Sequence, residues 1–201
     1  MSFSFLTLAK PVEGITFKEK GSKFIGYAFP IEDEDEAKEI LVQLWAQYPD
    51  ATHICYAFRL GVEGERYRAN DDGEPSGSAG LPIYNQIISK EITNVLVASV
   101  RYYGGTKLGV SGLVKAYKSS AQMVLDEAEI IEKHLTKKIR FEFSYEDQGS
   151  VMRNIDKFNA EVIFTGFTEK CIVEVSLRKE LKGNFLSAFE PLYNVNIVEL
   201  D

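Results

Sequence analysis

The sequence NVLVASVRYYGGTKLGVSGLVKAYKSSAQM, residues 94–123, determines the predicted fold of the first part of the chain. Residues 95–100 form an apolar run with the length and continuity of a strand that is covered on both faces. Four glycines follow between residues 104 and 112, and apolar residues recur at helical spacing from Leu113 onward. The stretch therefore predicts a buried strand, a glycine-rich turn and an amphipathic helix.

Three consecutive residues at the end of this strand alternate in direction. In a regular strand, Arg101 and Tyr103 lie on one face and Tyr102 lies on the other. Either tyrosine could stack on a base, as aromatic side chains do in RNA recognition. Because the two side chains point to opposite faces, we expect one to serve a ligand and the other to join the core.

The same region has an unusual charge distribution. The whole chain has a net charge of −7, yet no Asp or Glu occurs between Glu91 and Asp126. The basic residues of this interval are Arg101, Lys107, Lys115 and Lys118. A flexible turn that enters a helix N-terminus suits an anion, because unpaired N–H groups and the helix dipole point there. We therefore predict an anion-binding turn at Gly104 and Gly105, although these glycines could instead only permit close packing.

The turn does not have the pattern of a nucleotide-binding P-loop. Gly104 and Gly109 show the GxxxxG spacing, but Val110 occupies the position of the phosphate-binding lysine. The acidity of the whole chain also argues against indiscriminate binding to polyanions. A different glycine-rich anion site, with charge supplied by Lys107 and Arg101, is the remaining hypothesis.

Two further groups of residues are candidates. The loop NDDGEPSGSAGLP, residues 70–82, carries carboxylates that could hold Mg²⁺. Its acidic residues are Asp71, Asp72 and Glu74. Acidic residues are also common in turns, and we prefer this interpretation, so no metal or other cofactor is predicted. His53 and Arg59 share one face of a predicted strand at 52–60 and are expected to line a groove, whereas Cys55 on that face is not expected to be a nucleophile.

The remaining pattern is that of an α+β protein with two domains. Residues 11–30 alternate as a hairpin, an acidic run then opens a helix that ends before Pro49, and residues 81–88 are predicted to be helical. From residue 134 the order is strand, helix, strand, strand, helix, strand, which is typical of a ferredoxin-like βαββαβ domain. We therefore predict an N-terminal domain at 1–132 and a C-terminal domain at 133–201.

The composition is that of an ordinary soluble protein, with 45% hydrophobic and 26% charged residues. No apolar run approaches the roughly 20 residues of a membrane span, so no membrane association is predicted. The N-terminus lacks the basic start and long apolar stretch of a secretory signal. Cys55 and Cys171 are far apart and are expected to be unpaired thiols in a reducing compartment, which predicts a cytoplasmic location.

Three segments of the sequence resemble the YigZ/IMPACT family in its bacterial, two-domain form. They are ATHICYAFR (51–59), NDDGEPSGSAGLP (70–82) and VRYYGGTKLGVSGLVKAY (100–117). The resemblance implies an N-terminal domain with the fold shared by domain 2 of a small-subunit ribosomal protein and domain IV of elongation factor G. It implies a ferredoxin-like C-terminal domain similar to the last domain of that factor. Lys115 stands where the family has an arginine, which keeps the charge but loses bidentate phosphate geometry.

The resemblance also implies a role. Family members are linked to the regulation of translation and are proposed to bind nucleic acid or the ribosome. Eukaryotic relatives bind a partner of a translation-regulating kinase through an extra N-terminal domain. Because this chain begins at the family core, we do not carry that activity over. A protein partner in translation control is a further expectation.

These observations predict a non-enzymatic, translation-associated protein that binds RNA or a ribosomal surface. Arg101 and the three lysines would contact phosphates, and Tyr102 or Tyr103 would stack on a base. The alternative is an enzyme that binds a nucleotide or another small molecule, in which the turn at 104–112 holds a phosphate and the acidic loop brings Mg²⁺. A protein-interaction module with an acidic surface is a third hypothesis. A groove shared by the acidic loop and the basic turn would favour a common site over scaffolding.

Overall fold

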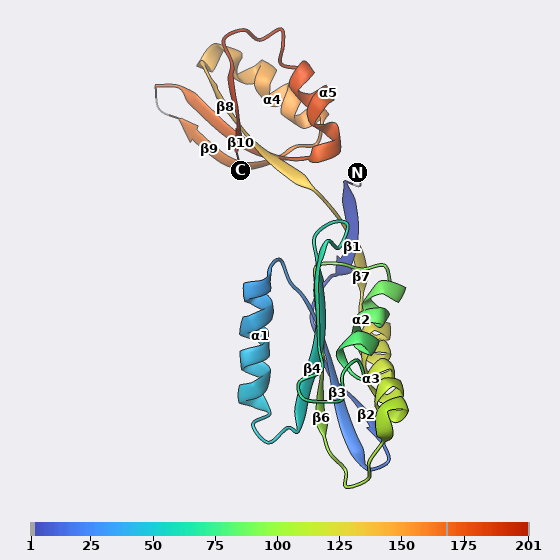
Figure 1. The fold of residues 1–201 in the computed structure, drawn as a ribbon. Coiled ribbons are helices and arrows are strands. Elements are labelled where there is room, and N and C mark those ends of the chain that lie inside the picture. Colours follow the sequence, from blue (N-terminus) through green and yellow to red (C-terminus); the bar gives the residue numbers. More distant parts are fainter. Residues whose placement is uncertain (1–2, 168, 201) are drawn as a thin grey trace. The chain divides into compact units, whose positions relative to one another are not determined.

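The computed structural model describes residues 3–167 and 169–200, which form two compact units (Figure 1). Ser4–Lys133 forms one unit, and the chain from His134 onward forms the other. Both units combine sheets and helices, so the predicted α+β class is confirmed. Within the described ranges, no helix has both the length and the apolar character needed to cross a membrane.

The first unit is built on a five-stranded antiparallel sheet with the strand order β2-β3-β6-β4-β5. The strands in this order are β2 (Val12–Glu19), β3 (Ser22–Pro30), β6 (Val95–Tyr102), β4 (His53–Leu60) and β5 (Arg66–Asn70). The helix α1 (Glu34–Gln47) covers one face, and α2 (Gly80–Ser89) and α3 (Gly109–Asp126) cover the other (Figure 1). The short strands β1 (Ser4–Leu8) and β7 (Ile130–His134) form a separate two-stranded sheet.

The central strand β6 owes its position to its apolar side chains. Val95 and Val97 pack into the core under α2 and α3. Ala98 and Val100 pack into the core under α1. The strand is therefore covered on both faces, as its continuous apolar run predicts, and each neighbouring strand pairs with it along its length.

The acidic run before α1 sets the start of that helix. Asp33 is the N-cap, and its side chain accepts hydrogen bonds from the backbone N–H groups of Asp35 and Glu36, both at 2.9 Å. Such a cap satisfies N–H groups that have no partner within the helix. The acidic first turn also complements the helix dipole, so this charge run is explained by local structure.

The second unit has the element order predicted for a ferredoxin-like domain. Its sheet is antiparallel with the strand order β11-β8-β10-β9. Its elements are β8 (Thr136–Phe143), η1 (Tyr145–Asp147), α4 (Gln148–Lys157), β9 (Glu161–Phe167), β10 (Cys171–Arg178), η2 (Lys179–Leu181), α5 (Lys182–Ser187) and β11 (Asn196–Leu200). The two helices pack on one face, where Phe141 of β8 stacks on Phe189 with 4.6 Å between ring centroids. The βαββαβ prediction is confirmed.

In the first unit, the glycine-rich turn that follows β6 lies against the tip of the β2–β3 hairpin. A Cβ atom on Gly104 would lie 1.9 Å from the carbonyl carbon of Gly21 and 2.2 Å from the backbone nitrogen of Ser22. The Ser22 hydroxyl accepts a hydrogen bond of 3.2 Å from the Gly104 N–H. Close backbone packing is therefore one function of this glycine. Gly105 differs, because it has a positive φ of 82° and open space around its Cβ position.

We expect Gly104→Ala to lower the free energy of unfolding by about 3 kcal/mol, because backbone atoms on the hairpin must move. Gly105→Ala is the matched control and should cost about 1 kcal/mol, the strain of a left-handed residue. Urea unfolding followed by the fluorescence of Trp45 measures both values, since the chain's single tryptophan lies in α1 of this unit. Equal losses in the two variants would contradict the proposed role of the backbone contact.

Candidate functional site

A buried ion pair lies where β6 ends. Arg101 Nη1 contacts Glu74 Oε1, and the two side chains are only 6% and 5% exposed. Tyr117 of α3 donates its hydroxyl hydrogen to the same carboxylate oxygen at 2.8 Å. The pair thus joins the acidic loop, the central strand and α3 at one point.

Neighbouring side chains bury Arg101. Its guanidinium lies over the ring of Phe24, 5.5 Å from the centroid, and 5.7 Å from the ring centroid of Tyr103. Its Nη2 donates to the Ser22 hydroxyl at 3.4 Å. The prediction that Arg101 contacts phosphates is therefore corrected: the residue is buried, and Glu74 balances its charge.

The carboxylates of Asp71 and Asp72 bind backbone amides within the first unit. The side chain of Asp71 accepts hydrogen bonds at 2.8–2.9 Å from the N–H groups of Gly77, Ala79 and Gly80. Asp72 Oδ2 accepts a bond of 2.7 Å from the N–H of Ile54 in β4. Across the described residues, no three His, Cys, Asp or Glu side chains are grouped so that they could hold a metal ion. The hydrogen bonds of these two side chains to backbone amides are those of residues that shape a turn.

The residues predicted to line a groove from β4 lie at opposite ends of the strand. His53 pairs with Arg101 in the sheet, whereas Arg59 pairs with Val95. Arg59 donates to the carbonyl oxygens of Ile92 and Glu63 at 3.0 and 2.9 Å, so it braces the far end of the sheet and does not join the site. Arg59 therefore lines a different hollow, with Glu63 and Ile88, and does not share a groove with His53.

His53 has one defined hydrogen-bond partner. Its Nδ1 lies 2.6 Å from the carbonyl oxygen of Asp72, and its Nε2 lies 3.9 Å from Glu74 Oε1. A carbonyl oxygen only accepts, so Nδ1 carries the hydrogen of this bond. Cys55 is fully buried and donates to the Asp71 carbonyl at 3.0 Å. Burial raises the pKa of this thiol, so it is no thiolate nucleophile.

A pocket of about 450 Å³ opens beside this network, and we call it the Tyr103 pocket. Its polar lining includes His53, Glu74 and Arg101. Leu108 and Val110 from the turn provide apolar lining, and Lys107 lines the same pocket. The acidic loop and the basic turn therefore share one groove, and Glu74 is the acidic residue of the loop that lines it.

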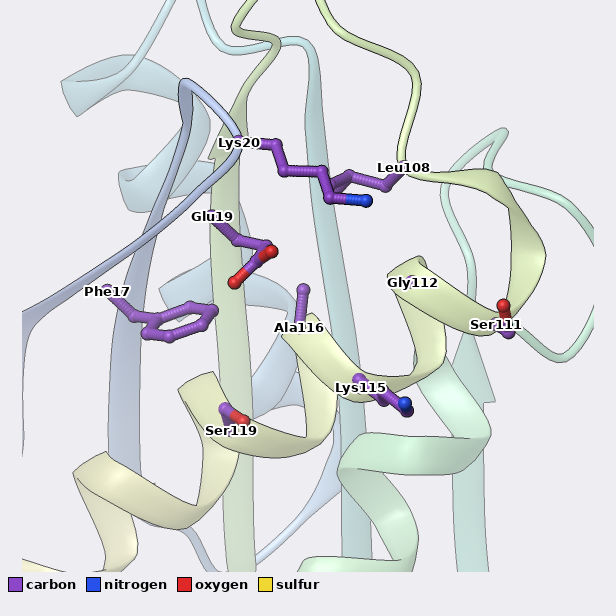
Figure 2. Close-up of a pocket in the computed structure, with 9 residues that line it drawn as sticks. All are labelled: Phe17, Glu19, Lys20, Leu108, Ser111, Gly112, Lys115, Ala116 and Ser119. Atoms are coloured by element: carbon purple, nitrogen blue, oxygen red, sulfur yellow. The ribbon is translucent and has the colours of Figure 1, made fainter.

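A second pocket of about 520 Å³ shares Leu108 with the first and lies beside α3 (Figure 2). Figure 2 shows Lys20 reaching across it from the hairpin tip and Lys115 lying on α3. Glu19 also lines this pocket, so its lining carries both signs of charge. Lys20 is not among the site residues predicted from the sequence, because its distance along the chain gives no sign that the hairpin tip meets α3.

The three predicted surface lysines do not converge on one pocket. Lys107, Lys115 and Lys118 are all exposed. Lys107 and Lys115 line the two pockets described above, and Lys118 lines a third hollow between α2 and α3. The lysines therefore surround the first half of α3.

The two tyrosines lie on opposite faces, as strand alternation predicts. Tyr102 packs on the α1 face against Tyr48, with 6.4 Å between ring centroids. Tyr103 is 46% exposed and lines the Tyr103 pocket. Its N–H donates to the Thr52 hydroxyl at 3.0 Å, which holds this residue at the strand end. Of these two tyrosines, Tyr103 is therefore the one that is accessible to a ligand.

Replacing Arg101 alone should lower the free energy of unfolding more than replacing both members of the ion pair. We expect Arg101→Ala to lower the free energy of unfolding by about 3–5 kcal/mol, because Glu74 would be left as a buried, unpaired charge. The double variant Arg101→Met/Glu74→Gln should lose about 2 kcal/mol less, since it leaves no such charge. Urea unfolding followed by Trp45 fluorescence compares the two. A double variant less stable than the single one would exclude this explanation.

The hydrogen bonds of Asp71 should make the free energy of unfolding depend on pH. Burial alone would raise the pKa of Asp71, but the N–H groups of Gly77, Gly80 and Ala79 outweigh this effect and lower it. Because the pKa is lower in the folded state, the Asp71 carboxylate stabilises that state at pH values above the unfolded-state pKa of about 3.9. This stabilisation is lost as the pH falls through the folded-state pKa. Asp71→Asn should therefore cost about 1 kcal/mol at pH 7, a low value because the carboxylate is partly solvated. Unfolding curves at pH 7 and near pH 3 should show this difference shrinking, and a constant difference would refute the assignment.

Comparison with known proteins relates this site to a family. A family model described as the Impact N-terminal domain matches residues 20–125. The chain is 35% identical over 135 residues to the IMPACT family member YvyE of Bacillus subtilis (strain 168), with 67% of this chain and 62% of that protein covered. It is 36% identical over 124 residues to the IMPACT family member YigZ of Escherichia coli (strain K12), with 61% and 60% covered. The matched part thus spans roughly three fifths of both relatives.

A solved structure is similar to this chain in fold. It is described as the crystal structure of a hypothetical protein and matches with a TM-score of 0.74 and 25% identity. The match covers 100% of this chain and 99% of that chain. Together with the family model, which matches the acidic loop and the glycine-rich turn, these findings confirm the resemblance seen in the sequence. The chain belongs to the IMPACT family.

Proposed function

We propose that this protein is a non-enzymatic, cytoplasmic, translation-associated protein that binds RNA, including RNA exposed on the ribosome. The observation that carries the proposal is the set of three exposed lysines around the first half of α3. These residues are Lys107, Lys115 and Lys118. They lie in an interval without Asp or Glu, on a chain with a net charge of −7.

The charges of these lysines are available to a ligand. Among the described residues, none of the three forms an ion pair, whereas Arg101 is paired with Glu74. Lysines that neutralise phosphates release counterions, which supplies much of the affinity of nucleic-acid binding. Lys20 and Lys115 line one pocket from two different elements, so a backbone phosphate could contact both (Figure 2).

The remaining features support binding more than catalysis. Asp71 and Asp72 hold backbone amides, and Cys55 is a buried thiol. Burial also raises the pKa of the Tyr117 hydroxyl, which disfavours its ionised form. We assign the protein to translation because of its family resemblance. A protein partner in translation control is compatible with this role.

Charge removal around α3 tests the proposal. Fluorescence anisotropy with a labelled single-stranded RNA should show log Kd rising with log salt concentration, with a slope of about 0.7 per phosphate contact. The triple variant Lys107→Gln/Lys115→Gln/Lys118→Gln should reduce that slope by about 2 and weaken binding at low salt.

A matched control removes the same charge elsewhere. Lys38, Lys138 and Lys157 are also exposed, on α1, β8 and α4. Their triple change to Gln should leave the salt slope within experimental error. Equal effects of the two triple variants would mean that total charge, and not the surface around α3, determines binding.

A further inference from the structure

We propose that the Tyr103 pocket holds one unpaired guanine base of the bound RNA. This inference rests on the proposed function and names what the pocket selects. Single-stranded RNA is recognised by stacking its bases on aromatic side chains and by hydrogen bonds to their Watson–Crick edges. The pocket combines an accessible aromatic ring with a buried acceptor, which are the two elements that such recognition needs.

The polar lining of the pocket favours a base with a donor edge. The described hydrogen bonds and ion pairs of the Glu74 carboxylate all use Oε1, so among the described residues Oε2 keeps its lone pairs for a ligand. Guanine presents two adjacent donors, N1–H and the N2 amino group, to the two lone pairs of Oε2, whereas uracil presents one N–H between two carbonyl oxygens. The pocket therefore favours guanine over uracil.

The apolar part of the pocket suits a planar ring. The ring of Tyr103 is 46% exposed, and the Arg101 guanidinium lies 5.7 Å from its centroid. Arg101 is itself held by Glu74, so the tyrosine ring packs against a fixed group. Base–aromatic stacking contributes about 1–3 kcal/mol per base. Leu108 and Val110 add aliphatic surface, and the volume of about 450 Å³ is within the range of small-molecule sites.

Lys107 is positioned to contact the phosphate of the same nucleotide. It lines the same pocket and is exposed, so its ammonium can reach a phosphate while the base is inside. The carboxylate of Glu74 lies in the same lining and only accepts hydrogen bonds, so it suits the donors of a base and not a phosphate oxygen. This division of charge places the base against Glu74 and the phosphate next to Lys107.

Three labelled RNA nonamers test the inference. They are U₄GU₄, the same sequence with inosine in place of guanosine, and U₉. Inosine lacks only the N2 amino group, so its comparison isolates one donor. We expect the guanosine nonamer to bind about tenfold more tightly than the other two, the typical discrimination of a paired hydrogen-bond contact to a base edge.

Two tryptophan variants locate the base. Val110→Trp, at a pocket residue that is 57% exposed, should fill the pocket and remove the preference for guanosine. Val42→Trp on α1, where Val42 is 68% exposed, adds the same side chain elsewhere and should retain the tenfold preference. Both sites are on the surface, so both variants should fold.

The outcomes separate this inference from the proposed function. Equal affinity of the wild type for all three nonamers, with the salt slope intact, would overturn the base pocket and leave RNA binding standing. A guanosine preference that survives Val110→Trp would place the base elsewhere and overturn the assignment. Failure of every nonamer to bind would overturn the proposed function, and this inference with it.

Discussion

The buried pair of Arg101 and Glu74 is the constraint on which the geometry of the site depends. Two charges that are about 5% exposed are stable only when each satisfies the other, because desolvation costs several kcal/mol per ion. Glu74 must therefore reach the end of β6, and the loop at 70–82 is held over the sheet. The bonds of Asp71 and Asp72 to backbone amides then determine the path of the loop on either side of this contact. One electrostatic requirement thus organises a loop that has no regular structure of its own over most of its length.

This pairing also decides which charges face the solvent. Arg101 lies within the central strand β6, and Glu74 balances its charge internally. The positive charge at the surface around the glycine-rich turn therefore comes from the lysines of the turn and of α3. At physiological ionic strength this field is screened over about 8 Å, so it acts only on a ligand that is nearly in contact. The acidic remainder of the chain repels polyanions in general, and the combination favours selective binding over indiscriminate binding.

The sequence predicted the elements well and their mutual positions poorly. The apolar run of β6, the acidic start of α1 and the βαββαβ order are local or periodic signals, and each appears in the structure. Periodicity placed His53 and Arg59 on one face of β4, but it does not state which end of a strand meets the site. Nothing near Arg101 in the sequence shows that a carboxylate 27 positions earlier will neutralise it. The sequence also could not distinguish Glu74 from Asp71 and Asp72, because the roles of three loop acids depend on which backbone amides lie near them.

The position of Glu74 has a consequence for what the shared groove can bind. A phosphate placed deep in the Tyr103 pocket would meet a carboxylate that is 5% exposed and only accepts hydrogen bonds, as a phosphate oxygen does. The glycine-rich turn therefore does not make this pocket a phosphate cradle, even though the turn leads into a helix N-terminus. A ligand compatible with both the carboxylate and Lys107 must present hydrogen-bond donors to one and negative charge to the other. A nucleotide within a single strand has a base that presents hydrogen-bond donors and, on the other side of its sugar, a phosphate that carries negative charge. A free phosphate provides the negative charge and has no base.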